Sequence, residues 1–449
     1  MKQHNAHILE GSLTRGVITL STPVIFAMFF QSLLNIVDTF WVGKLGATAV
    51  AALSMSWPVV FITIALAAGI STGATALVAR FVGGKDISKA GQATQSAMVL
   101  SLGASLLLTG VGFVFAPQLF TFLGASGEMY QQALAYTNII FYGTVFMILL
   151  FTLGAVLRGE GDTTTPMKIG IAMNIVNIVI DPFFIFTLGW GVAGAAIGTV
   201  IANIFGFGMY LAYFWRGRSI VPLIVRHFVT TSEMVKEILF IGVPASLRNV
   251  SNAIGVFFTI KIISSYGTAA VAAYGIAFRV ESFGVLPVVA IALSAVTMVG
   301  QNLGAAQLRR AKASGWVSVM LGTTIMAVFG FLLFINASSV VAIFNNESEV
   351  VRIGTEVLKI KAPFFLFSAV IMILSSAFQA FGKSHYSLVI TVLRVILMIG
   401  LAYLFNSIWG LSGVWWAITV SGLIFAVASM FWYHRYQPQS IQPRTGSDT

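Results

Sequence analysis

Long apolar stretches alternate with short polar connections along the whole chain. Twelve of the stretches hold about 20 or more mainly apolar residues, the length that an α-helix needs to cross a bilayer. We predict membrane spans at residues 17–42, 49–79, 91–116, 132–157, 166–188, 192–215, 237–263, 268–299, 312–335, 357–381, 386–408 and 411–433. The pattern therefore predicts an all-α integral membrane protein with twelve transmembrane helices.

The composition supports this fold class. Of the 449 residues, 58% are hydrophobic and 9% are charged, whereas about 25% of the residues in a soluble domain are charged. A soluble protein of this composition could not cover its surface with polar side chains. The sequence has no cysteine, no phosphate-binding loop and no histidine cluster, so we expect neither an enzyme nor a protein that depends on a cofactor.

The positions of lysine and arginine predict the orientation. Seventeen of these residues fall in one set of connections and five, Lys361 among them, in the opposite set. Because the richer side of a membrane protein faces the cytoplasm, we predict a multi-pass protein of the plasma or inner membrane with both termini in the cytoplasm. The net charge of +11 then reflects topology and contact with anionic lipid, so we expect no nucleic-acid partner.

The sequence contains an internal repeat. Pro23 of the first half corresponds to Pro244 of the second, and several Gly and Ala pairs follow at the same offset without a gap. Each copy holds six spans, which predicts two parallel lobes related by an axis along the membrane normal, as in transporters that work by alternating access. We predict a cytoplasmic N-terminus (1–16), a first lobe (17–215), a linker (216–236), a second lobe (237–433) and a cytoplasmic tail (434–449).

Three acidic residues, Asp38, Asp181 and Glu281, fall within predicted spans. A charge at the centre of a membrane helix costs at least ~2.5–3.5 kcal/mol, which makes a functional role the first hypothesis. Asp38, Asp181 and Thr199 each lie about five to eight residues, or ~8–12 Å, from the predicted outer end of a first-lobe span. The same helices carry further amide side chains on the matching faces: Gln31, Asn35, Asn174, Asn177 and Asn203. Of these we expect Asn35, Asn174 and Asn203 to contribute to substrate binding or gating.

The possible ligands in these side chains are carboxylate, amide and hydroxyl groups. Carboxylate, amide and hydroxyl oxygens suit a hard cation or a proton rather than zinc or copper. We therefore expect a site that binds Na⁺, H⁺ or both in competition. The alternative is a polar network that joins helices.

The second lobe does not repeat the acidic pair. Thr259 occupies the position equivalent to Asp38, and the predicted spans of this lobe carry Arg248, Arg279, Glu281 and Arg394 instead. We expect Glu281 to pair with Arg248, either as a structural ion pair or with a role in substrate binding or gating. Met28 and Tyr142 are candidates for the lining of an apolar substrate cavity.

At this point the chain resembles the multidrug and toxic compound extrusion (MATE) family, and more closely its prokaryotic DinF-like branch. The resemblance covers about residues 10–435 and depends on Pro23 with Asp38, the loop 79–86, the segment 157–162 and Asn177 with Asp181-Pro182. It implies a V-shaped fold of two lobes, and a Na⁺ or H⁺ site formed by Asp38, Asn177, Asp181 and Thr199 with Gln31 nearby. Pro23 would allow the first span to bend.

The resemblance implies export of organic cations or amphipathic compounds in exchange for Na⁺ or H⁺. We therefore predict a secondary active multidrug efflux antiporter, which we expect to be a monomer, with drug-like substrates and membrane lipids as its partners. The first alternative is a flippase for a lipid-linked saccharide, which would need a basic, hydrophilic cavity. The second is a receptor or scaffold that transports nothing.

Overall fold

The computed structural model describes residues 6–223 and 230–439, which form helices and no strands. Residues 1–5, 224–229 and 440–449 of the predicted termini and linker lie outside the described residues. The helices are α1 (Ala6–Leu9), α2 (Leu13–Gly43), α3 (Ala47–Gly83), α4 (Ile87–Phe122), α5 (Gly127–Glu160), α6 (Thr164–Pro182), the π-helical turn η1 (Phe183–Thr187), α7 (Gly191–Trp215), α8 (Ser232–Ser264), α9 (Thr268–Gly284), α10 (Leu286–Gly304), α11 (Leu308–Phe344), α12 (Ser348–Ala380), α13 (Ser384–Trp409) and α14 (Leu411–Arg435).

Eleven helices in the described part of the chain are long and apolar enough to cross a membrane. They are α2 to α7, with η1 continuing α6, and α10 to α14. The remaining predicted span, 237–263, corresponds to α8, which has 33 residues but carries Arg248, Asn249 and Asn252 in its middle. The predicted span 268–299 is divided into α9 and α10 at Val285, just before Pro287, which has no backbone N–H to donate within a helix.

The helix ends reproduce the internal repeat. α2 and α8 end at Gly43 and Ser264, which are separated by the same offset as Pro23 and Pro244. The same offset relates the first residues of three further pairs of helices: α3 and α9, α4 and α11, and α5 and α12. Lys85 and Ala306, again equivalent in the repeat, both adopt positive φ angles, of 60° and 58°. Such angles are uncommon for residues other than glycine. Their recurrence shows that the two copies share backbone detail as well as helix lengths.

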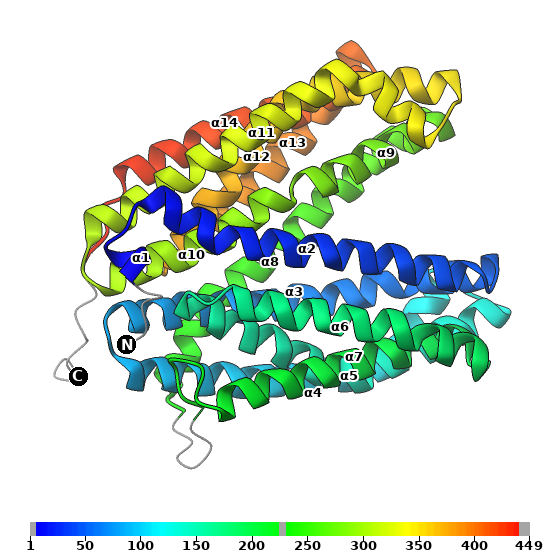
Figure 1. Cartoon of the computed structure of the whole chain (residues 1–449). Helices are drawn as coiled ribbons and strands as arrows, with labels where there is room; N and C mark the ends of the chain where they lie inside the picture. The colour runs from blue at the N-terminus through cyan, green and yellow to red at the C-terminus, as the bar shows by residue number, and fades with distance from the viewer. Residues whose placement is uncertain (1–5, 224–229, 440–449) are drawn as a thin grey trace. The chain divides into compact units, whose positions relative to one another are not determined.

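The described residues form two compact units, the first of which comprises Thr22–Val243. In it α5 packs against α3, α4, α6 and α7, and Figure 1 shows these helices running side by side. Gly143 of α5 faces Val200 of α7 so closely that a methyl group would overlap that side chain. A hydrogen bond of 2.6 Å between the hydroxyls of Ser101 and Thr152 joins α4 to α5.

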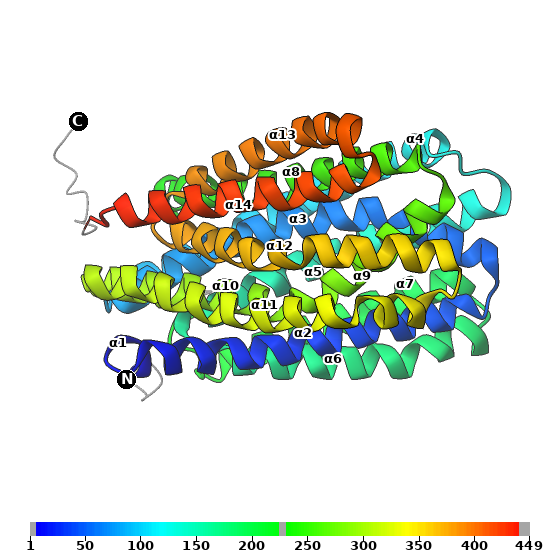
Figure 2. The same ribbon diagram turned by 90° about the horizontal axis from the view of Figure 1, so that it is seen from above.

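The second unit comprises residues 6–21 and 244–439 of the described chain. Its central helix is α12, which packs against α9, α10, α11, α13 and α14; Figure 2 shows α12 alongside α13 and α14. The core of this unit contains Trp415, which is fully buried and stacks on Tyr274 with ring centroids 5.8 Å apart.

Both boundaries between the units fall inside a helix, beside one of the repeated prolines. The first turns of α8, before Pro244, belong to the first unit, where Glu237 pairs with Arg80 of α3 at 3.0 Å. The beginning of α2, before Pro23, belongs with α1 to the second unit, where Asn302 donates a hydrogen bond to the carbonyl of Ile8 at 3.3 Å. The first long helix of each repeat therefore passes from one unit to the other near its proline.

Candidate functional site

The structure brings together the two aspartates predicted for the first unit. Asp38 lies on α2 and is partly buried, and Asp181 lies on α6 and is fully buried. Their carboxyl groups lie within hydrogen-bonding reach of each other. Asp181 occupies the end of α6 before Pro182 and the π-helical turn η1, and such irregular turns are frequent at functional sites.

Each carboxyl group has an oxygen without a donor. Asn177, one turn before Asp181 on α6, donates from Nδ2 to Asp181 Oδ1 at 2.7 Å. Asp181 Oδ2 and Asp38 Oδ1 are both buried and accept no hydrogen bond from any described residue. A buried acceptor left unpaired is unfavourable, so this pair is suited to receive a proton or a cation.

α7 approaches the pair through Gly198, where a methyl group would overlap Asp181 Oδ1. Thr199 is the next residue, and its hydroxyl donates to the carbonyl of Ala195 in the same helix at 3.1 Å. Its oxygen can still accept a proton or bind a cation. Gly198 therefore allows Asp181 to lie directly against α7.

Sequence reasoning missed Tyr136 and Gly198. Tyr136 on α5 interacts electrostatically with both Asp38 and Asp181, and it packs with Trp41 in an apolar cluster around Val42 and Ile185. No motif distinguishes Tyr136 from the other aromatic residues of the chain. Tyr136 therefore connects the aspartate pair to an apolar cluster, and electrostatic interactions are stronger where apolar groups exclude water.

Other predicted residues lie on the same helices but make no hydrogen bond to either carboxyl group in the described part of the chain. Gln31 and Asn35 on α2 are exposed, Asn174 on α6 is buried, and Asn203 on α7 is partly buried. Of the candidates for a substrate cavity, Met28 is partly buried. Tyr142 is 70% exposed and its ring lies 5.1 Å from that of Phe113.

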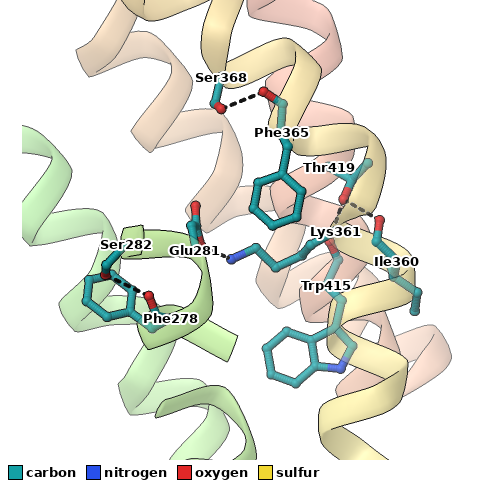
Figure 3. A network of polar contacts seen from close by, with 9 residues as sticks. All are labelled: Phe278, Glu281, Ser282, Ile360, Lys361, Phe365, Ser368, Trp415 and Thr419. Atoms are coloured by element: carbon teal, nitrogen blue, oxygen red, sulfur yellow. Dashed lines mark hydrogen bonds and ion pairs between the residues drawn. The ribbon is translucent and has the colours of Figure 1, made fainter. Parts of the chain in front are cut away.

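The predicted pair between Glu281 and Arg248 is wrong. Glu281 of α9 instead pairs with Lys361 of α12, with 2.6 Å between Oε2 and Nζ (Figure 3). The assignment of Lys361 to a connection is also wrong, because Lys361 lies well inside α12 and its side chain is 5% exposed. The signal that places it is the predicted span 357–381 itself, which contains Lys361.

The ligand types of the aspartate pair limit the ions that it can bind. The described residues contain no group of three or more His, Cys, Asp or Glu that could hold a metal ion. Two carboxylates, one amide and one hydroxyl supply oxygen atoms only, which suits a hard monovalent cation or a proton.

Comparison with known proteins agrees with the repeat and the fold. The family model MatE matches residues 23–183 and 244–404, two segments that begin at the repeated prolines. The chain is 26% identical over 424 residues to the multidrug export protein MepA of Staphylococcus haemolyticus, covering 94% of this chain and 93% of that protein. The corresponding values for MepA of Staphylococcus aureus strain RF122 are 25% identity over 432 residues and 96% of each chain.

Solved structures show the same architecture. A crystal structure of MATE in complex with MaD5 matches with a TM-score of 0.90 and 28% identity, covering 97% of this chain and 98% of the other. An outward-facing multidrug resistance MATE transporter of the MOP superfamily matches with a TM-score of 0.91 and 27% identity, with the same coverage. These matches confirm the predicted all-α membrane fold. Since the family model covers well over half of the sequence, the chain belongs to the MatE family, the multidrug and toxic compound extrusion family that its motifs resemble.

Proposed function

We propose that this chain is a secondary active multidrug efflux antiporter that exports amphipathic or cationic compounds in exchange for H⁺ or Na⁺. The observation that carries the proposal is the aspartate pair, in which Asp38 Oδ1 and Asp181 Oδ2 are buried without a donor. Its relatives named multidrug export protein support transport of drug-like molecules. Because these relatives are named as export proteins, they also favour this function over a saccharide flippase.

The pair provides a physical basis for ion coupling. Two ionised carboxylates within hydrogen-bonding reach repel each other, so binding of one proton or one Na⁺ relieves the repulsion. A proton would be shared between Asp38 and Asp181. Na⁺ would take oxygens from both, with Asn177 and Thr199 as the further ligands that we propose.

Coupling to transport requires that the ion and the substrate favour different states of the protein. Asp38 and Pro23 lie on the same helix, α2, which passes from one unit to the other near that proline. A proline inside a helix removes one backbone hydrogen bond and permits a bend. We propose that occupation of the pair changes the bend of α2, and that substrate binds the state with the empty pair.

The remaining predictions about the cellular setting belong to the same proposal. The apolar helices make the chain a multi-pass membrane protein. We propose the plasma membrane as its location, with both termini in the cytoplasm, because 17 of the 25 Lys and Arg residues fall on that side. We propose that it acts as a monomer, with Gln31 contributing to the ion site. We propose a role in substrate binding or gating for Asn35, Asn174 and Asn203.

The test is efflux of ethidium from proteoliposomes under a Na⁺ gradient and, separately, under a pH gradient. We expect efflux to follow at least one gradient and to fall at least tenfold in Asp38→Asn and Asp181→Asn, because an amide can neither release a proton nor balance a cation. Glu128→Gln is the matched control, since Glu128 is an exposed carboxylate of the same unit. Normal gradient-driven efflux in Asp38→Asn would contradict the proposal.

A further inference from the structure

Basic side chains gather at one level inside the second unit. Arg248, Lys361 and Arg394 lie on α8, α12 and α13, and the acid at the same level is Glu281 on α9. Each of the four lies about four helical turns, or ~20–24 Å, from the end of its helix on one side of the membrane. We call these four residues the cationic cluster.

Lys361 and Glu281 neutralise each other. The ammonium group of Lys361 lies 2.6 Å from Glu281 Oε2 and 5.7 Å from the ring centroids of both Tyr274 and Phe364. Figure 3 shows the side chain of Lys361 extending from its helix to Glu281. The single carboxylate of the cluster is therefore already engaged by a buried cation.

The two arginines have no such compensation. Arg394 donates from Nη2 to Asn252 Oδ1 at 2.8 Å, a neutral acceptor, and it interacts electrostatically with both Lys361 and Glu281. Arg248 lies one turn before Asn252 on α8 and forms no ion pair or hydrogen bond with a described residue. The cluster thus carries two positive charges more than its acid balances.

The cluster is not fully closed off by the rest of the second unit. Asn252 is exposed, Arg248 and Arg394 are partly buried, and the Glu281 side chain is 21% exposed. Polar and charged side chains at this depth in a membrane face a water-filled cavity or other protein rather than lipid tails. Arg394 bonds to Asn252, and Arg248 lies four residues before Asn252 on the same face of α8. An anionic group beside Asn252 could therefore reach both guanidinium groups.

We propose that Arg248 and Arg394 bind the carboxylate or phosphate group of a transported amphiphile. Guanidinium groups hold such anions through two parallel N–H bonds. Asn252 accepts from Arg394 through Oδ1, so its Nδ2 remains available to donate to the same anion. The Lys361–Glu281 pair holds the neighbouring helices in place. This inference rests on the proposed transport and extends the substrate class from cations to zwitterions and anions.

A matched pair of dyes tests the anion site. Rhodamine 19 carries a free carboxylate, and rhodamine 6G is its ethyl ester with the same cationic ring system. Fluorescence polarisation on the purified protein gives the Kd of each dye for the unmodified chain, Arg248→Gln and Arg394→Gln. We expect each substitution to weaken rhodamine 19 binding about tenfold or more, as for a lost charged hydrogen bond, and to change rhodamine 6G binding less than twofold.

Two controls separate this result from general damage. Arg352→Gln removes an exposed arginine from the first turns of α12 and should change neither Kd. On the unmodified protein, benzoate should displace rhodamine 19 and leave rhodamine 6G bound. Equal loss of both dyes in the two arginine variants, or no loss together with no effect of benzoate, would overturn the proposal.

Transport of the same dyes in proteoliposomes distinguishes the two proposals. If rhodamine 19 binds selectively but neither dye moves under a Na⁺ or pH gradient, the antiport proposal fails while the anion site stands. If rhodamine 6G is exported and neither arginine variant loses rhodamine 19 selectively, the anion site fails while the antiport proposal stands.

Discussion

In the first repeat, α2 and α6 carry Asp38 and Asp181, whereas the equivalent positions of the second repeat hold Thr259 and Ala402. Both of these are buried, with 3% and 2% exposure, and Ala402 belongs to the apolar core of its unit. Conversely, the second repeat carries cations where the first repeat has apolar residues. The positions equivalent to Lys361 and Arg394 are Ile140 and Met173.

The two repeats share their helical scaffold but differ in the charged residues inside it. The helices of the two repeats begin and end within two residues of equivalent positions, apart from the division of α9 from α10. This holds although one repeat carries the aspartate pair and the other carries the cationic cluster. Because equivalent helices form without the other repeat's charges, neither set of charges is needed to build the six-helix scaffold. Charges that are unfavourable in a membrane and unnecessary for the scaffold are best explained by binding.

The largest effect on stability is expected from breaking the ion pair of the second repeat. Lys361→Met leaves Glu281 without its partner, which destabilises a buried pair by ~3–5 kcal/mol. Adding Glu281→Gln to the same protein should recover most of this loss, because no unpaired charge remains. Thermal unfolding in detergent, followed by near-UV circular dichroism, measures both variants.

The exposed pair Arg352–Glu349 provides the control for that cycle. Arg352→Met should give no measurable change, since exposed ion pairs contribute little. A Lys361→Met protein as stable as the unmodified chain would mean that the pair does not form in the membrane protein.

A second prediction moves an acid to the other repeat. Thr259→Asp recreates Asp38 at the equivalent position, where Thr259 Oγ1 donates only to the carbonyl of Gly255. We expect a loss of ~2.5–3.5 kcal/mol and no rescue of ethidium efflux when it is combined with Asp38→Asn. The reason is that Ala402 and Met398 occupy the positions equivalent to Asp181 and Asn177. Thr259→Val, which keeps the shape, is the control. Restored efflux in the double variant would show that either repeat can host the coupling site.

A third prediction concerns the close contact behind the aspartate pair. In Gly198→Ala the new methyl group overlaps Asp181 Oδ1, so Asp181 must move away from α7. We expect a stability loss of ~1–3 kcal/mol and slower gradient-driven efflux with ethidium binding unchanged. Gly208→Ala on the same helix is the control, because no atom lies within 4 Å of its added methyl group. Equal behaviour of the two variants would exclude a role for this contact.

Much of the fold was predictable because the bilayer imposes a simple length and polarity pattern on the sequence. The span predicted at 17–42 corresponds to α2, Leu13–Gly43. The span predicted at 357–381 is only the apolar part of α12, which begins at Ser348. Hydropathy detects the segment in contact with apolar surroundings and not the whole helix. Lys361 lies inside the predicted span 357–381, so counting it among the connection charges conflicts with that span.

The aspartate pair was predictable because depth along separate helices can be counted from their ends. The partner of Glu281 was not predictable in the same way. Arg248 and Lys361 both lie at a compatible depth, and the choice between them depends on which helices are neighbours. That adjacency comes from packing, in which α12 contacts α9 directly, and a single sequence does not encode it in its periodicity.

The smallest expected effect compares two amides at equivalent positions, Gln31 on α2 and Asn252 on α8. Asn252 accepts a hydrogen bond of 2.8 Å from Arg394, whereas Gln31 is exposed and has no hydrogen bond to a described residue. Asn252→Ala should lower the free energy of unfolding by ~0.5–1.5 kcal/mol, the usual value for one such bond, and Gln31→Ala should leave it unchanged. Thermal unfolding of both variants in the same detergent measures the difference. Equal melting temperatures would mean that Arg394 is held by other contacts, and the guanidinium group would then be positioned for an anion without help from α8.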